Sequence, residues 1–508
     1  KVSNNRLTAD VSNGDADISI AMNNNVLESV GIKAGTLELG RFGKDALIVA
    51  ETSGNSLNAS FTGGKKRTFS FSGNRLTASG LEVTDLKAAD YYGATQIYFQ
   101  NNQLNLGSWT GSIDADVEFK AYGINASGKI EASNNFGGAI NVDSSGNVGH
   151  ISQFKVHNSK IMTYGIKAGS FTVNGTIDTN ITVNAGTNST WDVQSAFGIS
   201  VNTLKAEAFS GSISVAGDTL SGSSLSVAAF GLYVAQDGVG ISGNTAGDAF
   251  DINGSIKSTY CGILSYGTIN LRISGMIDAP IAIMVESTYN EQTGIFYTRT
   301  PNNPDKVELA DGAVINGAVD LGGGENTMVI NSGATMNGTL AADQGKMNIT
   351  FMLDKTVKSG AIVTTNINDV SLTSASTITV NLNNAVEGGR YVLFDYGSAY
   401  PVGAYWMSRE VRFVYQGEEY RVSMVDGRAE CTFSNGVRGT LVYEQSTQQV
   451  VAVINDMKAA PAFTGQTRAE VNYQDRAVTL YWNGAARAEQ FEIEYSINGG
   501  KSIVVKVD

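Results

Sequence analysis

The sequence is poor in the residues that interrupt or cross-link a sheet. Its 508 residues include five prolines and two cysteines, Cys261 and Cys431. Because proline cannot donate a hydrogen bond to a β-ladder, its scarcity favours continuous sheets. Two cysteines so far apart cannot supply the disulfide framework of a small secreted domain. We therefore expect both to be buried or free thiols.

Long apolar runs and excess positive charge are also missing. The longest apolar segment, residues 279–285 (APIAIMV), is far shorter than the roughly 20 residues of a membrane-spanning helix. It is predicted to be a buried strand. The formal net charge is −13, which disfavours nucleic acid and anionic lipid as partners. We expect no nucleic-acid binding and no membrane insertion by this chain, which begins without Met and which we take for a segment of a longer protein.

The chain is rich in glycine, with 58 residues, and in short runs where apolar and polar residues alternate. In residues 112–119, Ile113, Ala115, Val117 and Phe119 fall on one face and acidic residues on the other. This period of two is that of a half-buried β-strand. In residues 171–183 the inward positions are predicted to be Phe171, Val173, Ile177, Ile181 and Val183. The fold class is therefore predicted to be all-β.

One short motif recurs along the chain: Asn, Ser or Thr, then Gly, any residue, and Ile, Val or Leu. Its glycines are Gly111, Gly128, Gly175, Gly211, Gly254, Gly275, Gly317 and Gly338. From Gly211 onward they are spaced by one or two multiples of about 21 residues. Such a period predicts a right-handed parallel β-helix (a solenoid with ~21-residue coils), with each Gly turning a corner at positive φ. A set of hairpins is the alternative, because Asn-Gly also favours tight β-turns.

A second motif places an aromatic residue before glycine and an apolar residue. Its aromatic positions are Tyr122, Tyr164, Phe197 and Phe230. Since the motif repeats in register with the apolar pattern, we expect these rings to form an internal stack rather than a row of exposed side chains.

The rhythm of the sequence changes twice. Residues 1–350 carry the motifs and are predicted to be the parallel β-solenoid. Residues 351–460 have longer strands and fewer glycines, and we expect a β-rich cap that covers the last strand, because a bare edge invites aggregation. Within this region residues 411–427 predict a hairpin that turns at residues 416–418. Residues 461–508 are predicted to be a linker and part of a β-sandwich module.

Residues 311–345 (DGAVINGAVDLGGGENTMVINSGATMNGTLAADQG) resemble the passenger repeats of bacterial autotransporter adhesins, which share the Asn-Gly corners and the LGGGENT glycine run. Residues 387–396 (EGGRYVLFDY) are similar to the segment that follows such repeats. The tail resembles the first strands of a fibronectin type III module, with Trp482 and Tyr495 as core aromatics. The first resemblance implies a secreted β-helical passenger on the bacterial cell surface. Its expected partners are host or environmental glycans or surface proteins, with self-association as a further possibility.

One acidic cluster is a candidate site. Asp114, Asp116 and Glu118 share the outward face of a predicted strand, where three carboxylates can hold calcium or act as acid and base on a polysaccharide. The alternative is a solvated face with Lys120 as counter-charge. Two histidines leave little room for a Ser-His-Asp site. We expect no catalytic residue and no cofactor, and keep a polysaccharide lyase or glycoside hydrolase, and a self-assembling surface filament, as alternatives to an adhesive rod.

The glycine run at residues 322–326 has a similar ambiguity. A calcium-binding roll requires tandem copies of Gly-Gly-x-Gly-x-Asp. Here Glu325 and Thr327 stand where that repeat needs Gly and Asp, and there is a single copy. The run is therefore predicted to be a tight corner.

Overall fold

The computed structural model describes the chain in segments that together contain every strand discussed below. They are residues 1–13, 18–63, 67–106, 113–150, 156–186, 193–217, 227–236, 238–298, 303–341, 345–354, 361–363, 370–371, 376–386, 388–397, 409–456, 466–472, 477–482, 491–495 and 503–507. Within these segments every helix or strand is a β-strand, β1 to β45, so the all-β prediction is confirmed. In the same segments no helix is long and apolar enough to cross a membrane.

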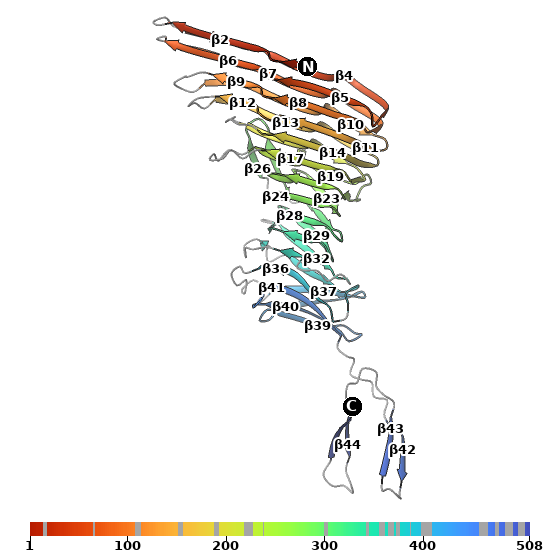
Figure 1. Cartoon of the computed structure of the whole chain (residues 1–508). Coiled ribbons are helices and arrows are strands. Elements are labelled where there is room, and N and C mark those ends of the chain that lie inside the picture. The colour runs from red at the N-terminus through yellow and green to blue at the C-terminus, as the bar shows by residue number, and fades with distance from the viewer. Residues whose placement is uncertain are drawn as a thin grey trace.

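Most strands belong to one long sheet in which neighbours run parallel. The series begins with β4 (Val26–Phe42), β7 (Arg67–Tyr91), β10 (Ile113–Ala132), β13 (Val156–Val173) and β15 (Val193–Lys205). It continues through β18 (Ala228–Val234), β22 (Cys261–Ser265), β24 (Met276–Val285) and β28 (Val314–Asp320). Figure 1 shows the strands stacked one below another from the N-terminal end, so that the body is elongated.

Two further parallel series accompany the first. One consists of β5 (Leu47–Ser53), β8 (Ala94–Gln100), β11 (Phe136–Asp143), β14 (Thr176–Ala185), β17 (Ser212–Gly217) and β21 (Ser255–Ser258). The other is a separate four-stranded sheet of β2 (Arg6–Asn13), β6 (Ser56–Gly63), β9 (Gln103–Leu106) and β12 (Val148–His150). Parallel neighbours cannot be the two arms of one tight hairpin, so the hairpin interpretation is wrong for these strands.

Columns of apolar side chains form the core. One column holds Ile124, Ile166, Ile199, Leu232, Ile263 and Ile283, all paired in register and buried. Because neighbouring strands are about 4.8 Å apart, similar side chains at one register position pack directly on each other. The inward positions predicted for residues 171–183, together with Val117 and Phe119, are all buried. The period-two analysis is therefore confirmed there.

The spacing between successive strands is not the predicted constant. Side-chain hydrogen bonds between neighbouring strands or corners show how the spacing shortens. Asn25 and Asn74 are 49 positions apart, and Asn102 and Asn147 are 45 apart. Asn180 and Ser212 are 32 apart, and Asn316 and Asn337 are 21 apart. The prediction of ~21-residue coils over residues 1–350 is therefore wrong for the first half. Before residue 150 the steps are longest because each also contains a strand of the four-stranded sheet, which the glycine motif does not detect.

The role predicted for the motif glycines is also corrected. Of those in the described residues, Gly317 and Gly338 alone have positive φ, 129° and 149°. The others are required by close approach between strands. A Cβ atom on Gly254 would lie 2.1 Å from the carbonyl oxygen of Gly211, so no larger residue fits without moving the backbone. Gly111 lies outside the described residues.

A ladder of asparagines lines one of the true corners, and its members Asn55, Asn102 and Asn147 are buried. In the series Asn5, Asn55, Asn102 and Asn147, the peptide N–H and the Nδ2 of each residue donate to Oδ1 of the next at 2.9–3.2 Å. The residue before each has positive φ, between 55° and 70°. The sequence signal for these corners is thus Asn-Asn or Gly-Asn, because the first residue must adopt the left-handed conformation. The second residue supplies the ladder.

Antiparallel pairing appears toward the C-terminus. Parallel pairing continues past residue 350 through β32 (Lys346–Met352), β35 (Thr377–Asn381) and β37 (Glu410–Tyr415). β36 (Arg390–Asp395), β39 (Arg428–Thr432), β40 (Val437–Glu444) and β41 (Gln449–Asp456) then pair antiparallel. The hairpin predicted within residues 411–427 is confirmed: β37 pairs antiparallel with β38, which ends earlier than predicted (Glu418–Ser423).

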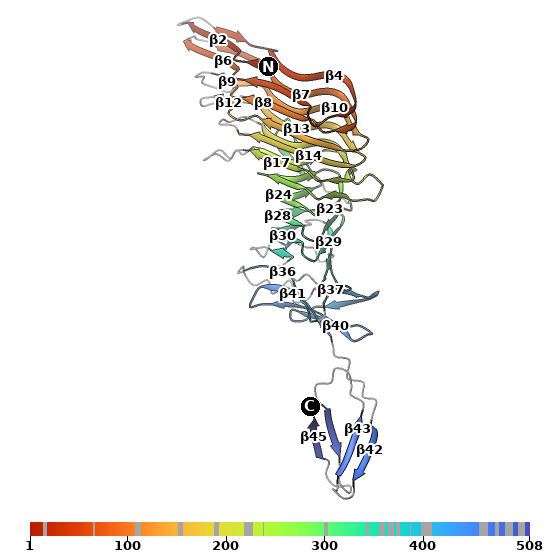
Figure 2. The same cartoon turned by 45° about the vertical axis from the view of Figure 1, so that its right-hand side comes forward.

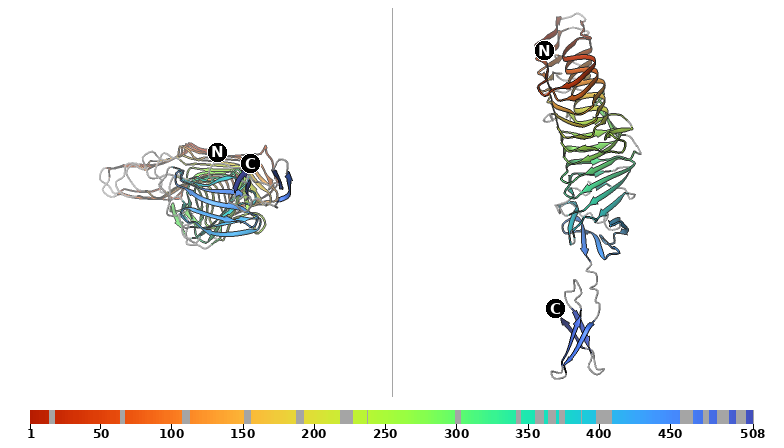
Figure 3. Two further views of the ribbon diagram at one scale, coloured as in Figure 1. Left: turned by 90° about the horizontal axis from the view of Figure 1, so that it is seen from below. Right: turned by 90° about the vertical axis from the view of Figure 1, so that its right-hand side faces the viewer.

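The last strands form two antiparallel pairs, β42 (Gln466–Asn472) with β43 (Ala477–Trp482) and β44 (Phe491–Tyr495) with β45 (Ile503–Val507). They lie beyond the end of the stack in Figures 2 and 3. Cys261 and Cys431 are buried free thiols, as expected.

Candidate functional site

Of the three predicted acidic residues, the structure describes the side chains of Asp116 and Glu118. Asp116 is exposed, and the side chain of Asp114 lies outside the described residues. Glu118 is half-buried and pairs with Lys120 at 2.7 Å and with Arg75 at 3.4 Å. Burial acts to raise the pKa of Glu118, but Lys120 and Arg75 together hold that pKa below its ordinary value. Among the described residues no group of three or more His, Cys, Asp or Glu side chains is placed to hold a metal ion.

Ion pairs continue on neighbouring strands of this face. Lys33 on β4 pairs with Glu28 at 3.0 Å and with Glu82 on β7 at 2.8 Å, and Lys87 pairs with Glu38 at 3.2 Å. Exposed pairs of this kind contribute at most about 1 kcal/mol each. They make the face polar and hydrated and bring together carboxylates and cations from successive strands.

The rings of the aromatic-glycine motif form a continuous stack, as predicted. The ring centroids of Tyr122, Tyr164, Phe197 and Phe230 are separated in turn by 5.0, 4.9 and 5.0 Å, with interplanar angles of 7°, 8° and 13°. We call these four residues the aromatic column. The column is part of a second apolar cluster, separate from the main core. It therefore lies on the opposite side of the sheet from the core column that contains Ile124, Ile166 and Ile199.

The glycine of the motif explains why the aromatic ring and the apolar residue two positions after it lie on opposite faces of the sheet. Tyr164 is followed by Gly165 and Ile166, and the pairing register skips Gly165. A Cβ on Gly165 would lie 2.5 Å from the carbonyl oxygen of Gly198 on the next strand. The backbone thus makes an irregular step at each motif glycine, which turns the apolar residue inward while the ring stays outside.

A short insertion covers the aromatic column. Strands β25 (Ser287–Asn290) and β26 (Ile295–Thr298) form an antiparallel hairpin. The ring of Tyr289 lies 5.1 Å from Phe230, and the ring of Phe296 lies 5.9 Å from it. The hydroxyl of Tyr233 donates to the carbonyl oxygen of Tyr289 at 2.8 Å. Tyr233 precedes Tyr289 by 56 residues, so the hairpin packs on strands that lie much earlier in the chain.

The tip of the hairpin is held by polar contacts to β13. Glu291 accepts hydrogen bonds from the Tyr164 hydroxyl at 2.7 Å and from Lys167 Nζ at 2.5 Å. Lys167 also lies over the Tyr164 ring, 4.4 Å from its centroid. Burial, and then the charge of Glu291, raise the pKa of Tyr164 well above its ordinary value. We refer to Glu291, Tyr164 and Lys167 as the latch.

Two buried carboxylates flank the base of the hairpin. The chain leaves the long sheet at Glu286, whose φ is 62°. It pairs with the sheet again from Lys306, directly after Asp305. Glu286 and Asp305 are both fully buried. Oε2 of Glu286 accepts from the Gly323 N–H at 2.6 Å, so the glycine run forms the predicted tight corner around this carboxylate. Oδ1 of Asp305 accepts from the Ile269 N–H at 2.7 Å. Burial, with a smaller contribution from the charge of Glu286, raises the pKa of Asp305 to about 7 against the effect of this hydrogen bond.

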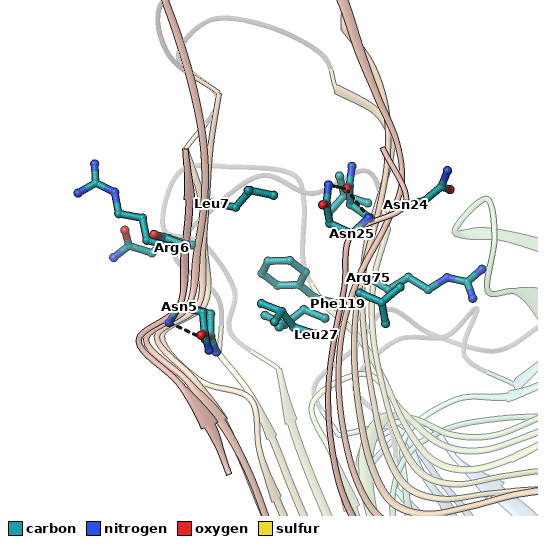
Figure 4. A pocket seen from close by; sticks show the side chains of 15 residues that line it. Asn5, Arg6, Leu7, Asn24, Asn25, Leu27, Arg75 and Phe119 are labelled. Atoms are coloured by element: carbon teal, nitrogen blue, oxygen red, sulfur yellow. Dashed lines mark hydrogen bonds between the residues drawn. The ribbon is translucent and has the colours of Figure 1, made fainter. Parts of the chain in front are cut away.

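A cavity of about 400 Å³ opens at the N-terminal end. It lies between the corner of Asn5 and a second corner where Asn25 bonds to Asn74, and Leu27 and Phe119 project into it (Figure 4). The amides of both corners are engaged in their ladders. The lining is therefore mainly apolar, and sequence analysis did not identify it.

Compared with known proteins, the chain matches no family model, no curated protein and no solved structure. What the structure defines is the class: an all-β protein with a long, mostly parallel sheet. The hairpin, its latch and its buried acidic base are features that spacing in the sequence did not indicate, because their partners lie up to 132 residues away.

Proposed function

We propose that the long sheet is a right-handed parallel β-solenoid and that the chain is an adhesive rod of the autotransporter-passenger type. In this proposal the rod is secreted or displayed on a bacterial cell surface and binds glycans or surface proteins. The observation that carries the proposal is the in-register parallel pairing from β4 to β28, which repeats one outward face strand after strand. Right-handed connections are the general preference of parallel strands.

The outward face of β8 and its neighbours has the chemistry that glycans require. Tyr98 is 41% exposed, and its hydroxyl donates to Gln96 at 3.3 Å. On the next strands Asn141 and Thr182 are exposed and paired in register. Aromatic faces stack on sugar rings, while amides and hydroxyls exchange hydrogen bonds with sugar hydroxyls. A repeated polar face with an exposed ring supports multivalent, individually weak binding.

Retention of the chain on immobilised glycans and on cell-surface proteins tests this function. The wild-type chain should be retained, and Tyr98→Ala should reduce retention at least about tenfold, because stacking of one ring contributes on the order of 1.4 kcal/mol. Tyr297→Ala is the matched control, since Tyr297 is also exposed but lies on the hairpin. If the wild type is retained on no glycan or surface protein, the adhesive function is wrong.

A polysaccharide lyase is the second candidate, because Arg75, Glu118 and Lys120 bring a carboxylate and two cations together on adjacent strands. Such groups neutralise a uronate and remove its proton in lyase chemistry. The wild type should then raise the absorbance of unsaturated products from a uronate polymer, and Glu118→Gln should abolish the signal. An unchanged absorbance with the wild type would remove this candidate and leave the adhesive proposal standing.

A further inference from the structure

The buried asparagines of the corners follow one hydrogen-bonding rule. Oδ1 accepts from the peptide N–H of a residue on the preceding strand, while Nδ2 donates to a backbone carbonyl oxygen. Asn147 accepts from Asn102 N at 2.9 Å and donates to Phe99 O at 2.7 Å. Asn326 likewise accepts from Asp305 N at 3.0 Å and donates to Gly323 O at 2.8 Å. The amide thus has a donor and an acceptor, and both are used.

Asp305 stands at the next place of the ladder that contains Asn326. Strands β23 (Thr268–Ile273), β27 (Lys306–Leu309) and β29 (Glu325–Asn331) pair in parallel there. Oδ1 of Asp305 accepts from Ile269 N, as the rule requires. Its Oδ2 therefore occupies the position where asparagine has its Nδ2 donor. Among the described residues this oxygen has no hydrogen-bond partner, and the side chain is fully buried.

No nearby cation among the described residues compensates a charge on Asp305. The charged group that acts on it is Glu286, which has the same sign. Lys306 is exposed on the following position, and Glu325 on the adjacent strand pairs with Lys346 at 2.7 Å. A buried carboxylate beside a second carboxylate is most stable when protonated. A protonated Oδ2–H is also a donor, so the neutral acid can do what the Asn amide does at the other corners.

We propose that Asp305 is a protonated acid that acts as an asparagine at the base of hairpin β25–β26, and that its ionisation loosens the hairpin from the aromatic column. The hairpin is then a pH-operated strap. In its closed state it buries Tyr164, Phe197 and Phe230, and in its open state it exposes their apolar face. This inference is independent of what the rod binds.

The direction of the pH effect follows from the pKa. Folding raises the pKa of Asp305 from an ordinary value of 3.8 to about 7. The closed state therefore binds more protons than an opened state in which this carboxyl is hydrated. Its stability falls as the pH rises from about 4 to about 7, and the loss is complete above that range.

Cys261 reports on the position of the hairpin. It is buried in the cluster that contains the aromatic column, so a thiol reagent reaches it when the hairpin opens. In a Cys431→Ser background, the rate of reaction with 4,4′-dithiodipyridine is measured at pH 5 and pH 8. The rate for the wild-type Asp305 is divided by the rate for Asp305→Asn at each pH, so that the pH dependence of the thiol itself cancels.

The ratio should be at least about tenfold higher at pH 8 than at pH 5, since each unit of pKa difference is worth tenfold in the opening equilibrium. Asp311→Asn, at an exposed turn, should behave as the wild type. Glu286→Gln removes the like charge and lowers the closed-state pKa of Asp305, so the rise in Cys261 labelling should be smaller and should level off at lower pH. This test does not depend on Asp305→Asn folding. Equal ratios at pH 5 and pH 8 would overturn the proposal. So would closure of the wild-type hairpin at pH 8 by millimolar calcium, because the site would then hold a cation rather than a proton.

Discussion

The Oδ1 atom of Asn147 accepts two hydrogen bonds from Asn102, one from its peptide N–H at 2.9 Å and one from its Nδ2 at 3.0 Å, although the residues are 45 positions apart. Both side chains are fully buried. Since buried amides must be paired, this geometry ties each strand of the stack to one register with the next. The apolar columns allow every strand register that keeps the apolar face inward. The asparagine hydrogen bonds select one of these registers.

Replacing Asn102 with Ala is expected to lower the free energy of unfolding by about 2–4 kcal/mol, because the peptide N–H of Asn55 loses its acceptor and the carbonyl oxygen of Thr52 loses the Nδ2 donor. Hydrogen exchange of the Asn55 amide and thermal unfolding measure the effect. Asn141→Ala, at an exposed position, should change stability by less than about 0.5 kcal/mol. Equal effects of the two variants would show that the ladder contributes nothing specific.

The sequence GIKAG occurs at residues 31–35 and 165–169. The last glycine of the first copy and the first glycine of the second copy offer a test of close approach. A Cβ at Gly165 would lie 2.4 Å from Ile181 Cγ2 and 2.5 Å from Gly198 O, whereas a Cβ at Gly35 meets nothing within 4 Å. Gly165→Ala should therefore destabilise the chain by about 3 kcal/mol or more. Gly35→Ala should be neutral. Thermal unfolding that is the same for both would contradict the packing described here.

Phe197 has a ring neighbour in the aromatic column on each side. Phe197→Ala should cost about 3–5 kcal/mol through lost burial and the cavity left behind. It should also raise the rate of hydrogen exchange in hairpin β25–β26, which packs on the column. Tyr297→Ala, on the exposed side of the hairpin, is the control. A column that were only a surface feature would give both variants the same small effect.

Glu118 should make stability depend on acid. Its pKa is held below the ordinary value by Lys120 and Arg75, so its ion pairs stabilise the fold above the unfolded-state pKa, about 4.3. That contribution is lost as the pH falls through the lower folded-state pKa. Glu118→Gln should lower the melting temperature by more at pH 7 than at pH 3. A variant whose deficit is the same at both pH values would show that the ion pairs are not responsible.

The sequence predicted those parts of the fold that depend on local periodicity. Alternation identified the buried residues of 171–183, and the aromatic-glycine motif identified the aromatic column, because both patterns report which face of a strand is inward. The turn between β37 and β38 was also predictable from Gly417, whose φ is 83°. Each of these features is determined within a few residues.

Other parts could not be predicted because they depend on contacts between distant segments. The coil length was wrong since the four-stranded sheet adds residues to the early steps without altering the motif. The motif glycines were assigned to corners, yet Gly254 is required by the backbone of Gly211 on the preceding strand. Glu291 lies in an ordinary turn, and nothing local indicates that it bonds to Tyr164, 127 positions earlier.

Cross-linking across the stack tests the central claim most directly. Asn141 and Thr182 are exposed and paired in register on β11 and β14. In a background without Cys261 and Cys431, cysteines at these positions should be about 4.8 Å apart at Cα and should form a disulfide rapidly on mild oxidation. The control pair, cysteines at positions 141 and 214, spans two strands at about 10 Å and should not link.

The predicted result is therefore a disulfide between positions 141 and 182 and none between positions 141 and 214. If both cysteines of the first pair react with a monofunctional maleimide but do not link to each other, the parallel stack is contradicted, and with it the rod and the adhesive function.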